Sequence, residues 1–307
     1  MRTFPLLTIF TPAYNRAYLL SRLYGSLCCQ TCQDFCWLVV DDGSTDNTRE
    51  LVHGWIGENK IPIRYVYKEN GGMHSAHNVA YRLIETDLNT CIDSDDYMPD
   101  DAVEKILRYW KKHGSDQVSG LVGLDADTEG NIIGTGFPEH GGSMTLTDFY
   151  HHGGTGDKKL VYRTRVMKEL PEYPEFPGER YVGLGYKYLL ADLQMPLLTV
   201  NEVLVHVDYQ QDGSSHTMWK QYGRHPQGFA FLRRETMKYH PYFKERFKAA
   251  IHHISSCIYL RRNPVADSPS PIMSLCALPL GLVLHLIILA KTKHTQLNFN
   301  NIYKIFL

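Results

Sequence analysis

The stretch CWLVVDDGSTDNT, residues 36–48, joins an apolar run to an abrupt polar stop. Five consecutive apolar residues bounded by turn residues are typical of a buried strand, which Asp41 and Asp42 end. Asn47 is followed three residues later by Glu50, a spacing similar to that of a capping box, so a helix should begin directly afterwards. The stretch therefore predicts a strand, a polar loop and a helix in that order.

The same order of elements recurs on both sides of this stretch. Apolar runs that predict strands occupy residues 6–10, 61–67 and 88–93, and each is followed by a helical pattern. Four strand–helix units in succession are typical of a doubly wound α/β sheet whose parallel strands carry helices on both faces. Residues 118–209 are more irregular and richer in strand patterns, which is typical of functional loops on such a sheet.

The last third of the chain changes character. Helical patterning returns from about residue 218 to 262, and residues 272–290 contain no charged residue. At ~1.5 Å per residue this uncharged segment reaches about 28 Å as a helix, close to the ~30 Å thickness of the bilayer core. Pro279 and Gly281 favour a kinked, interfacial or re-entrant helix over a straight span, and a buried core helix is the alternative.

These patterns divide the chain into three expected regions. We expect an α/β domain over residues 1–210, made of halves 1–115 and 116–210, then a helical extension over 211–265 and an apolar, membrane-associated tail over 266–307. The N-terminal apolar run is too short and broken for a signal peptide, so the α/β domain is expected in the cytoplasm.

Composition narrows the class of protein. Hydrophobic residues make up 43% of the chain and charged residues 21%, which is enough apolar mass for a full-sized core. The 32 Lys and Arg against 33 Asp and Glu give a formal net charge of -1. The chain therefore lacks the excess positive charge of a dedicated nucleic-acid binder, and we expect no nucleic-acid partner.

The seven cysteines do not form the even set that a secreted disulfide framework needs. Cys28, Cys29, Cys32 and Cys36 crowd together, and the CxxC spacing of Cys29 and Cys32 invites a zinc site. A second CxxC or a nearby His pair that would complete such a site is missing from the sequence. We therefore favour small buried thiols, with a metal-stapled interaction module as the alternative.

Polar residues gather after each of the four predicted strands, in residues 11–15, 41–44, 70–72 and 93–96. In open α/β sheets ligands bind beyond the carboxyl ends of the strands, where such loops meet. Turn formation alone would explain one loop of this composition. Four of them in succession favour a ligand site.

DSDD, residues 93–96, places three carboxylates directly after the fourth predicted strand. Such neighbours repel one another unless a cation neutralises them, and their hard oxygens suit Mg²⁺ or Mn²⁺ together with substrate phosphates. The alternative is a solvated cluster that caps the next helix. The sequence has neither GxGxxG after the first strand nor GxxxxGK[ST], so a nucleotide diphosphate would be neutralised by a metal rather than by a glycine loop. Asp41 or Asp42 could then accept a hydrogen bond from a uracil-type base.

Four sequence blocks together resemble a known family. TPAYNR at 11–16, VDDGSTDNT at 40–48, ENGGMHSAHN at 69–78 and DSDD at 93–96 are similar, in order and spacing, to the blocks of family 2 glycosyltransferases. Members of that family are metal-dependent, inverting enzymes of the GT-A fold, so the resemblance implies a doubly wound mixed sheet. Less tightly, PGERYVGLGYKYLL, VNEVLVHVDYQQDGSS and FAFLRRETMKYHPYFKERF resemble a bacterial branch linked to capsular and exopolysaccharide assembly.

The resemblance also implies roles for individual residues. The nucleotide-sugar site would be formed by residues that match the four blocks: Thr11, Pro12, Tyr14, Asn15, Asp41, Asp42, Asn70, Gly71, Gly72, His77, Asn78, Asp93 and Ser94. Pro12 and Tyr14 would frame the base, and Asp93 with Asp95 would hold the metal. Where relatives often carry a basic residue this sequence has His77, which would share the charge of the diphosphate.

An inverting transfer needs a carboxylate base beside the acceptor hydroxyl. Many relatives place it in an acidic pair before a late helix, where this sequence has Leu184 and Gly185 instead. Glu179 is the nearest carboxylate and the first choice for this catalytic base, with Asp157 and Asp192 in reserve. A surface ion pair between Glu179 and a neighbouring basic residue is the alternative.

The residues and the resemblance together predict an inverting, membrane-associated glycosyltransferase. It would move a sugar from a nucleotide diphosphate donor, with UDP favoured, to a lipid-linked or oligosaccharide acceptor in capsular or exopolysaccharide synthesis. The apolar tail would attach it to the cytoplasmic face of the bacterial cell membrane, and Mg²⁺ or Mn²⁺ would be its cofactor. A catalytically silent nucleotide-sugar-binding scaffold is the alternative, because the expected acidic pair is missing.

Overall fold

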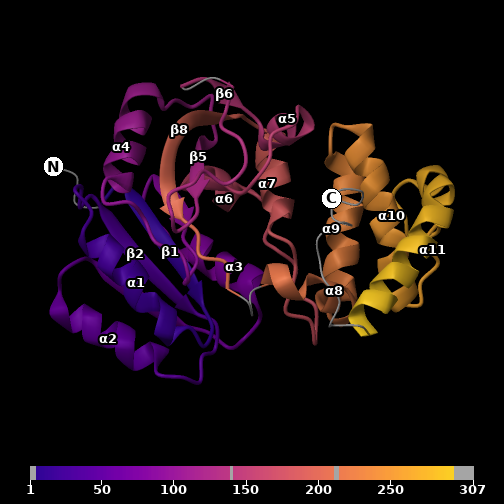
Figure 1. Cartoon of the computed structure of the whole chain (residues 1–307), viewed down its shortest axis with the longest axis horizontal. Helices are drawn as coiled ribbons and strands as arrows, with labels where there is room; N and C mark the ends of the chain where they lie inside the picture. Colours follow the sequence, from indigo (N-terminus) through magenta and orange to yellow (C-terminus); the bar gives the residue numbers. More distant parts are fainter. Residues whose placement is uncertain (1–4, 139–140, 211–213, 294–307) are drawn as a thin grey trace. The chain divides into compact units, whose positions relative to one another are not determined.

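The computed structural model of the chain describes residues 5–138, 141–210 and 214–293. The chain divides into two compact units: the first comprises Met1–Tyr173 and Lys187–Gln210, and the second comprises Pro174–Tyr186 and Gln211–Leu307. Figure 1 labels most of their helices and strands.

The first unit is built on one eight-stranded sheet with the order β3-β2-β1-β4-β7-β5-β8-β6. The strands are β1 (Leu7–Ala13), β2 (Phe35–Asp41), β3 (Ile63–Tyr67), β4 (Leu88–Cys91), β5 (Gly120–Ala126), β6 (Ser143–Met144), β7 (Lys158–Arg163) and β8 (Leu197–His206). The first four strands are parallel, whereas β7 and β6 run antiparallel to their neighbours. The sheet is therefore mixed, and the predicted α/β class is confirmed.

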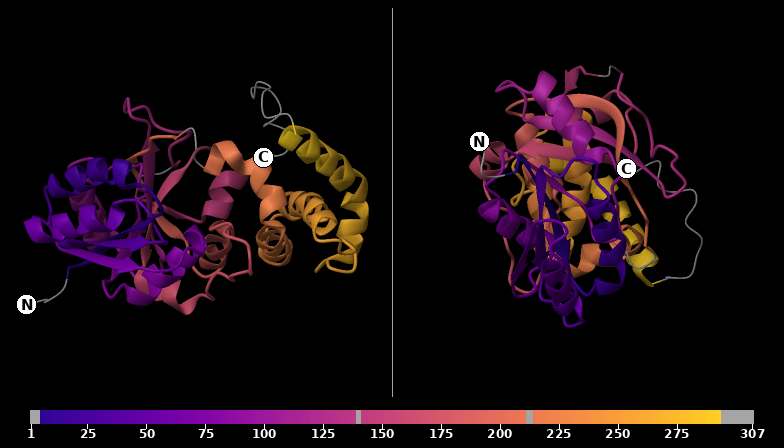
Figure 2. Two further views of the ribbon diagram at one scale, coloured as in Figure 1. Left: turned by 90° about the horizontal axis from the view of Figure 1, so that it is seen from below. Right: turned by 90° about the vertical axis from the view of Figure 1, so that its left-hand side faces the viewer.

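Helices cover both faces of this sheet (Figure 2). They are α1 (Ala17–Cys28), α2 (Thr48–Glu58), α3 (Met73–Leu83), α4 (Ala102–His113), α5 (Leu146–His151), α6 (Thr164–Glu169) and α7 (Gly185–Asp192). Successive side chains of a strand point to opposite faces. Accordingly Leu7 and Ile9 of β1 share a core with Leu20 of α1, while the Phe10 ring lies 5.5 Å from the Tyr81 ring of α3.

The start of α2 differs from its prediction. Asn47 precedes the helix but makes no capping hydrogen bond with its side chain. Asp46 does so instead, because its Oδ1 accepts hydrogen bonds from the Thr48 backbone N–H and hydroxyl at 3.1 and 2.6 Å. Its Oδ2 accepts from the backbone N–H of Ala17 at 3.1 Å. Although burial opposes ionisation, the hydrogen bonds from Thr48 and Ala17 lower the pKa of Asp46. The capping box predicted from Asn47 and Glu50 is wrong, and one aspartate braces the starts of two helices.

The second unit is helical and joins two regions that the sequence separates. Its helices are α8 (Ser214–Arg224), α9 (Pro226–Tyr239), α10 (Phe243–Tyr259) and α11 (Pro271–Lys293). Ala250 and Ile254 of α10 share a core with Ala277, Leu284 and Ile288 of α11. The helical extension and the apolar tail therefore form one body, and Pro174–Tyr186 belongs to it as well. This division differs from the three consecutive regions expected above.

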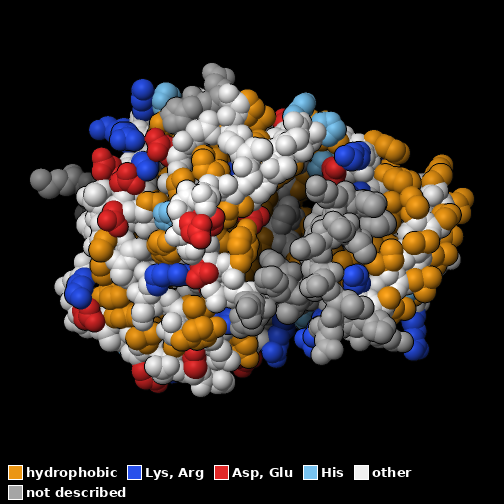
Figure 3. Space-filling view, viewed as in Figure 1, with side chains coloured by type: hydrophobic (Ala, Val, Ile, Leu, Met, Phe, Trp, Pro, Cys, Tyr) orange, Lys and Arg blue, Asp and Glu red, His pale blue; other side chains and the backbone are white. Residues whose placement is uncertain are grey.

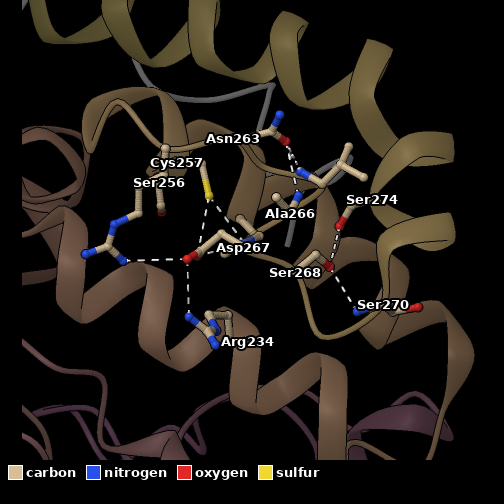
Figure 4. A network of polar contacts seen from close by, with 12 residues as sticks. Arg234, Ser256, Cys257, Asn263, Ala266, Asp267, Ser268, Ser270 and Ser274 are labelled. Atoms are coloured by element: carbon tan, nitrogen blue, oxygen red, sulfur yellow. Dashed lines mark hydrogen bonds and ion pairs between the residues drawn. The ribbon is translucent and has the colours of Figure 1, made fainter.

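The connector between α10 and α11 is held by a polar network around Asp267 (Figure 4). Asp267 Oδ1 lies 3.4 Å from Arg234 Nη1 and 3.8 Å from Arg262 Nη1, and its Oδ2 lies 3.5 Å from His253 Nε2. Cys257 Sγ lies 3.3 Å from the same histidine nitrogen, and the histidine, cysteine and aspartate atoms are close enough to share a metal ion. Burial lowers the pKa of His253 to about 4, with Asp267 opposing the shift. Two arginines balance the Asp267 charge, so the network clamps the connector. His253 Nδ1 is buried without a hydrogen-bond partner among the residues that the structure describes.

Candidate functional site

The loops after the first four strands meet at one edge of the sheet because these strands are parallel. Ala13 lies beside Asp41, and Asp41 lies beside Tyr67. β4 ends at Cys91, which lies beside Phe10 of β1. The polar segments that follow these strands are thereby brought to the position where open α/β sheets bind ligands.

The loop after β1 presents one exposed aromatic ring on a braced backbone. Thr11 and Pro12 are buried, and Thr11 Oγ1 accepts a hydrogen bond from Trp37 Nε1 at 3.0 Å. Asn15 adopts a left-handed conformation with φ of 53°, and its Oδ1 accepts a backbone N–H of the β2–α2 loop at 2.7 Å. Tyr14 is 44% exposed. Tyr14 is therefore the residue of this loop that can stack on a base, while Thr11 and Asn15 fix the loop.

Asp41 ends β2 and is only 1% exposed. Its Oδ1 accepts the backbone N–H of Ser44 at 2.7 Å, and its Oδ2 accepts the Tyr65 hydroxyl at 2.5 Å. Burial, and then the hydrogen bond to Asp41, raise the pKa of Tyr65, which keeps the phenol protonated as a donor. Both carboxylate oxygens are engaged, so a nucleobase would have to bind Asp41 as an additional donor.

Asp42 organises the loop after β3. Lys68 Nζ lies 2.6 Å from Asp42 Oδ1, and the backbone N–H groups of Gly71 and Gly72 donate to its two oxygens at 3.0 and 2.7 Å. The Asn70 amide donates to the backbone carbonyl of Asp42 at 2.7 Å. Gly72 has φ of 94°, which favours glycine. Asp42 is 3% exposed, so its carboxylate stabilises this loop and is not available for the base pairing predicted for it.

His77 and Asn78 of α3 point into the interior. Asn78 accepts the Tyr173 backbone N–H and donates to the Tyr173 carbonyl, both at 2.9 Å. The His77 ring packs against Tyr81. Burial, followed by the charge of Lys187, lowers the pKa of His77 to about 3. The imidazole is neutral and fully buried, so it does not supply the positive charge that the resemblance implies. Both residues instead fasten α3 to the segment around Tyr173.

In the segment after β4, partly exposed and buried side chains alternate. Asp93 and Asp95 are partly exposed, whereas Ser94 and Asp96 are buried. Burial, and then Asp93, raise the pKa of Asp95. Burial raises the pKa of Asp96 to about 7, with Lys159 opposing the shift and Asp93 and Asp95 adding to it. A bound divalent cation relieves repulsion of this kind.

Three residues that the sequence analysis missed lie beside these carboxylates. Arg22 of α1 donates to Asp208 Oδ2 at 2.7 Å and to the backbone carbonyl of Asp95. The backbone N–H of Asp208 donates to Asp96 Oδ1 at 3.2 Å. Although burial opposes its charge, carboxylates led by Asp125 raise the pKa of Lys159. Asp208 could have been found, because it follows a parallel strand as the predicted loops do. Lys159 could not, because only the antiparallel direction of β7 brings a strand start to this edge.

Glu179 lies in the second unit and caps α9. Its Oε1 and Oε2 accept the backbone N–H groups of Gln227 and Gly228, both at 2.9 Å. These donors belong to the first turn of α9, where the helix dipole favours a negative charge. Proton uptake by Glu179 would weaken the hydrogen bond to whichever oxygen receives the proton. This geometry argues against the catalytic role predicted for Glu179 and also differs from the ion pair considered as its alternative.

The two reserve carboxylates lie in the first unit. Asp157 is exposed, and its Oδ2 accepts the Tyr209 hydroxyl at 2.8 Å. Asp192 is buried, and its Oδ2 accepts the backbone N–H of Thr147 at 2.8 Å. Burial raises the pKa of Asp192 to about 6. Burial is the main cause that raises the pKa of the buried carboxylate Asp125, and Lys159 opposes this rise. The charge of Asp157 adds to the rise, so Asp157 lies near Asp125.

The clustered cysteines belong to separate elements. Cys28 ends α1, and Cys36 lies in β2 with its Sγ 3.3 Å from Thr8 Oγ1. Burial raises the pKa of the Cys36 thiol, with Thr8 opposing the shift. This disfavours the thiolate that zinc requires, so the interaction module built on these cysteines gains no support from the structure.

Known proteins share parts of this sequence. The family model described as "Glycosyl transferase family 2" matches residues 8–163. A chondroitin synthase of Pasteurella multocida (strain Pm70) is 33% identical over 150 residues, which cover 48% of this chain and 15% of that protein. A validoxylamine A glucosyltransferase of Streptomyces hygroscopicus subsp. jinggangensis (strain 5008) is 43% identical over 94 residues, 29% of this chain and 22% of that protein. The chain thus spans less than a quarter of these curated relatives.

Solved structures share the fold over nearly the whole chain. S. aureus TarS 1–349 is 18% identical with a TM-score of 0.57, and the alignment covers 97% of this chain and 94% of TarS 1–349. The mannosyltransferase PcManGT of Pyrobaculum calidifontis is 15% identical with a TM-score of 0.56, covering 94% of this chain and 84% of that one. The predicted GT-A fold is confirmed. Because the family model covers just over half of the 307 residues and includes all four loops of the sheet edge, the chain belongs to glycosyl transferase family 2.

Proposed function

We propose that the chain transfers a sugar from a nucleotide diphosphate sugar to an acceptor with inversion, and that UDP is the nucleotide. The observation that carries this proposal is the acidic segment after β4, where partly exposed carboxylates gather at the ligand-binding edge of the sheet. One solved TarS structure holds UDP-GlcNAc, and the PcManGT structure holds GDP-Man and Mn²⁺. Those ligands belong to these neighbours and support the choice of ligand class here.

The residues at this edge fit a divalent cation. Asp93 and Asp95 offer hard oxygen ligands on the outward side of the segment, and burial with mutual repulsion raises the pKa of Asp95. We assign Mg²⁺ or Mn²⁺ to this pair. When bound, such an ion supplies positive charge to the diphosphate leaving group. The chain's own residues position the donor around it.

The donor would lie across the loops after β1 and β3. Tyr14 would stack on the base, and Asp41 would accept the imide proton in addition to its present donors. Asn70 Oδ1 is buried and has no hydrogen-bond partner among the residues that the structure describes, so it would accept a ribose hydroxyl. Gly71 lets this loop pack closely against α3, because a Cβ there would lie 2.5 Å from Ser75 Oγ.

The proton of the acceptor hydroxyl needs a carboxylate, and we assign it to Asp157 rather than to Glu179. Asp157 is exposed in the first unit, and the Tyr209 hydroxyl donates to one of its oxygens. Both oxygens of Glu179 are occupied by the first turn of α9. A base must release such contacts to take up a proton, which makes Asp157 the better candidate.

We further assign the reaction to bacterial surface polysaccharide synthesis, with a lipid-linked saccharide as acceptor at the cytoplasmic face of the membrane. Chondroitin and hyaluronan synthases are among the curated relatives, which favours a polysaccharide product. α11 is long and apolar enough to cross a membrane by length and composition, and a lipid-linked acceptor would be found where this helix attaches.

The second candidate function is a silent nucleotide-sugar-binding scaffold. It is favoured by Leu184 and Gly185, which lead into α7 at the place where the resemblance expects an acidic pair. Such a protein would bind donor and metal through the same residues but would turn nothing over.

Donor turnover separates the two candidates. The full chain is incubated with UDP- and GDP-sugars and Mn²⁺, and release of the nucleoside diphosphate is measured with and without a lipid-linked saccharide fraction. We expect turnover with a UDP-sugar that EDTA abolishes, a loss of about 100-fold in Asp157→Asn and a much smaller loss in Glu179→Gln. Donor binding without any turnover would establish the scaffold. Equal turnover in Asp157→Asn and wild type would refute the assigned base.

A further inference from the structure

α11 is buried on one face and apolar on the other. Ala277, Gly281, Leu284 and Ile288 face the interior of the second unit. Exposed residues recur every three or four positions, as one face of a helix requires. Seven of them form what we call the α11 stripe: Ile272, Leu275, Cys276, Pro279, Leu282, Val283 and Leu286. Leu280 is exposed as well. Ile272 is 80% exposed, and Leu286 is 65% exposed. Figure 3 shows hydrophobic side chains gathered over α11. A patch of this kind marks an interaction surface.

Length alone would allow α11 to cross a membrane, since 23 residues at ~1.5 Å each give about 34 Å. Its buried face argues against crossing. Ser255 Oγ of α10 lies 3.0 Å from His285 Nδ1, and Ser274 donates to Ser268 at 2.7 Å. A membrane-crossing α11 would leave these partners and carry Ser274 and His285 into hydrocarbon. Taking α10 along would bury its charged first half, which contains Lys244, Glu245 and Arg246.

Pro279 supports the same conclusion from the exposed side. It lies inside α11 and belongs to the α11 stripe. Because proline has no N–H, the carbonyl four residues earlier, that of Leu275, cannot receive its helical hydrogen bond. At a membrane surface water can solvate this carbonyl, whereas the bilayer core offers no donor.

The chemistry of the α11 stripe favours lipid over a protein partner. It contains aliphatic side chains, one proline and one cysteine, and it lacks the aromatic residues and arginine that dominate protein interfaces. Arg261 precedes the helix and Lys291 follows the stripe. Arg262 is paired with Asp267, and residues 268–293 contain no Asp or Glu. Positive charge at both ends of an apolar face complements anionic headgroups.

We infer that α11 docks in the plane of an anionic membrane through the α11 stripe and does not cross it. The inference deepens the proposed function, on which it rests for the location of the acceptor: it names the lipid surface as the partner and a monotopic helix as the mode of attachment. Its test is independent of catalysis, so that failure of docking and failure of glycosyl transfer can be told apart.

Vesicle binding tests the surface. The full chain is sedimented with vesicles of phosphatidylcholine alone and with 30% phosphatidylglycerol, at about 0.05 and 0.5 M salt. We expect binding to the anionic vesicles that falls at least tenfold in Leu275→Gln/Val283→Gln/Leu286→Gln and weakens at high salt. The matched control is Ile132→Gln/Leu193→Gln, which removes two exposed apolar side chains of the first unit and should bind as wild type does.

Two results would overturn docking. Unchanged binding of the triple variant at an unchanged melting temperature would remove the α11 stripe from the interaction. A wild-type chain that is dimeric in solution, bound to no vesicle and made monomeric by the triple variant, would show that a second copy covers the stripe instead.

Depth measurement separates docking from crossing. Nitroxide labels are placed on Cys276 in a chain whose other cysteines are replaced, because Cys29 is exposed as well, and at Ile272→Cys, Val283→Cys and Leu286→Cys in cysteine-depleted chains. Their depth in anionic vesicles is read from relaxation by oxygen and by a water-soluble nickel complex. An in-plane helix predicts similar, shallow depths for all four positions. A depth that increases towards the middle of the helix and decreases again would mean that α11 crosses the bilayer, which would overturn the inference while leaving membrane attachment intact.

Discussion

Two acidic segments follow strands of the same sheet, and their carboxylates differ in burial and in hydrogen-bond partners. After β2, Asp41 and Asp42 are buried and each carboxylate oxygen has a local donor. After β4, Asp93 and Asp95 are partly exposed and crowd against a third carboxylate, Asp96. The first segment is internally neutralised and stabilises a loop. Although Lys159 lies near the second segment, burial and neighbouring carboxylates still raise the pKa of Asp96 there, so this segment fits an additional cation. Acidic residues after a strand therefore indicate a metal site only where the fold does not already supply their partners.

The largest expected effect concerns the internally neutralised segment. Asp42→Asn leaves the half-buried Lys68, whose side chain is 17% exposed, without its ion pair, so the free energy of unfolding should fall by about 3 kcal/mol. Urea denaturation followed by circular dichroism measures this change. Asp95→Asn is the matched variant in the other segment and should not destabilise the metal-free protein. Equal destabilisation by both would remove the distinction between the segments.

The next effect concerns activity rather than stability. Asp95→Asn should lower Mn²⁺-dependent kcat/KM by about 10²–10³-fold, because it removes a metal ligand while the fold remains intact. Initial rates over a Mn²⁺ titration give this value. Asp101→Asn, an exposed carboxylate at the start of α4 that pairs with Lys105, is the control and should retain activity. Full activity in Asp95→Asn would move the metal away from this segment.

A smaller effect is the pH dependence of metal binding. Burial and neighbouring carboxylates raise the pKa of Asp96 from 3.8 to about 7, so the folded state holds this proton more tightly than the unfolded state. The resulting stability is complete below about pH 4 and is lost as the pH rises through 7. Metal competes with the proton, so the rise in melting temperature caused by Mn²⁺ should grow by a few degrees between pH 5.5 and 8. Scanning calorimetry with and without Mn²⁺ measures it. A rise that does not depend on pH would contradict the crowding inferred for this segment.

The smallest expected effect is on the free energy of unfolding and concerns the cap of α2. Asp46→Ala removes the cap of α2 and the contact to α1, so the unfolding free energy should fall by about 1–2 kcal/mol. Asn47→Ala removes no capping hydrogen bond and should change stability by less than about 0.5 kcal/mol. Chemical denaturation of the two variants side by side provides the measurement, and the reverse order would restore the cap assigned from sequence.

Sequence patterns were sufficient for the parallel strands β1 to β4 and for the sheet edge at which their polar ends meet. Apolar runs such as residues 36–40 have no alternative to burial, and polar residues directly after them lie at the sheet edge once the strands are parallel. Patterns could not tell which carboxylates face inward. Asp42 is neutralised by Lys68, 26 residues away, and this pairing depends on the register of β2 with β3. Nor could they place Lys159 beside Asp96, because the reversed direction of β7 follows from pairing with β4 and β5.

The same limit explains Glu179. Its position before α7 made it the natural substitute for a missing acidic pair, since distance along the chain was the only available measure. The structure places its partners 48 and 49 residues later, at the start of α9. A helix cap formed by a residue so remote from the helix has no local sequence signature.

This interrupted connectivity has a consequence for synthesis on the ribosome. Pro174–Tyr186 is made before α7 and β8 but belongs with α9, which is made after them. The first unit can therefore complete its sheet before the helices that pack with Pro174–Tyr186 have been synthesised. A chain that stops after Gln210 would keep every strand yet leave the Glu179 carboxylate without the N–H groups of Gln227 and Gly228. Deleting the C-terminal helices would therefore remove the partners of Pro174–Tyr186 as well as the attachment to a membrane, and a loss of activity could come from either change. For this reason α11 is better examined by substitution than by shortening the chain.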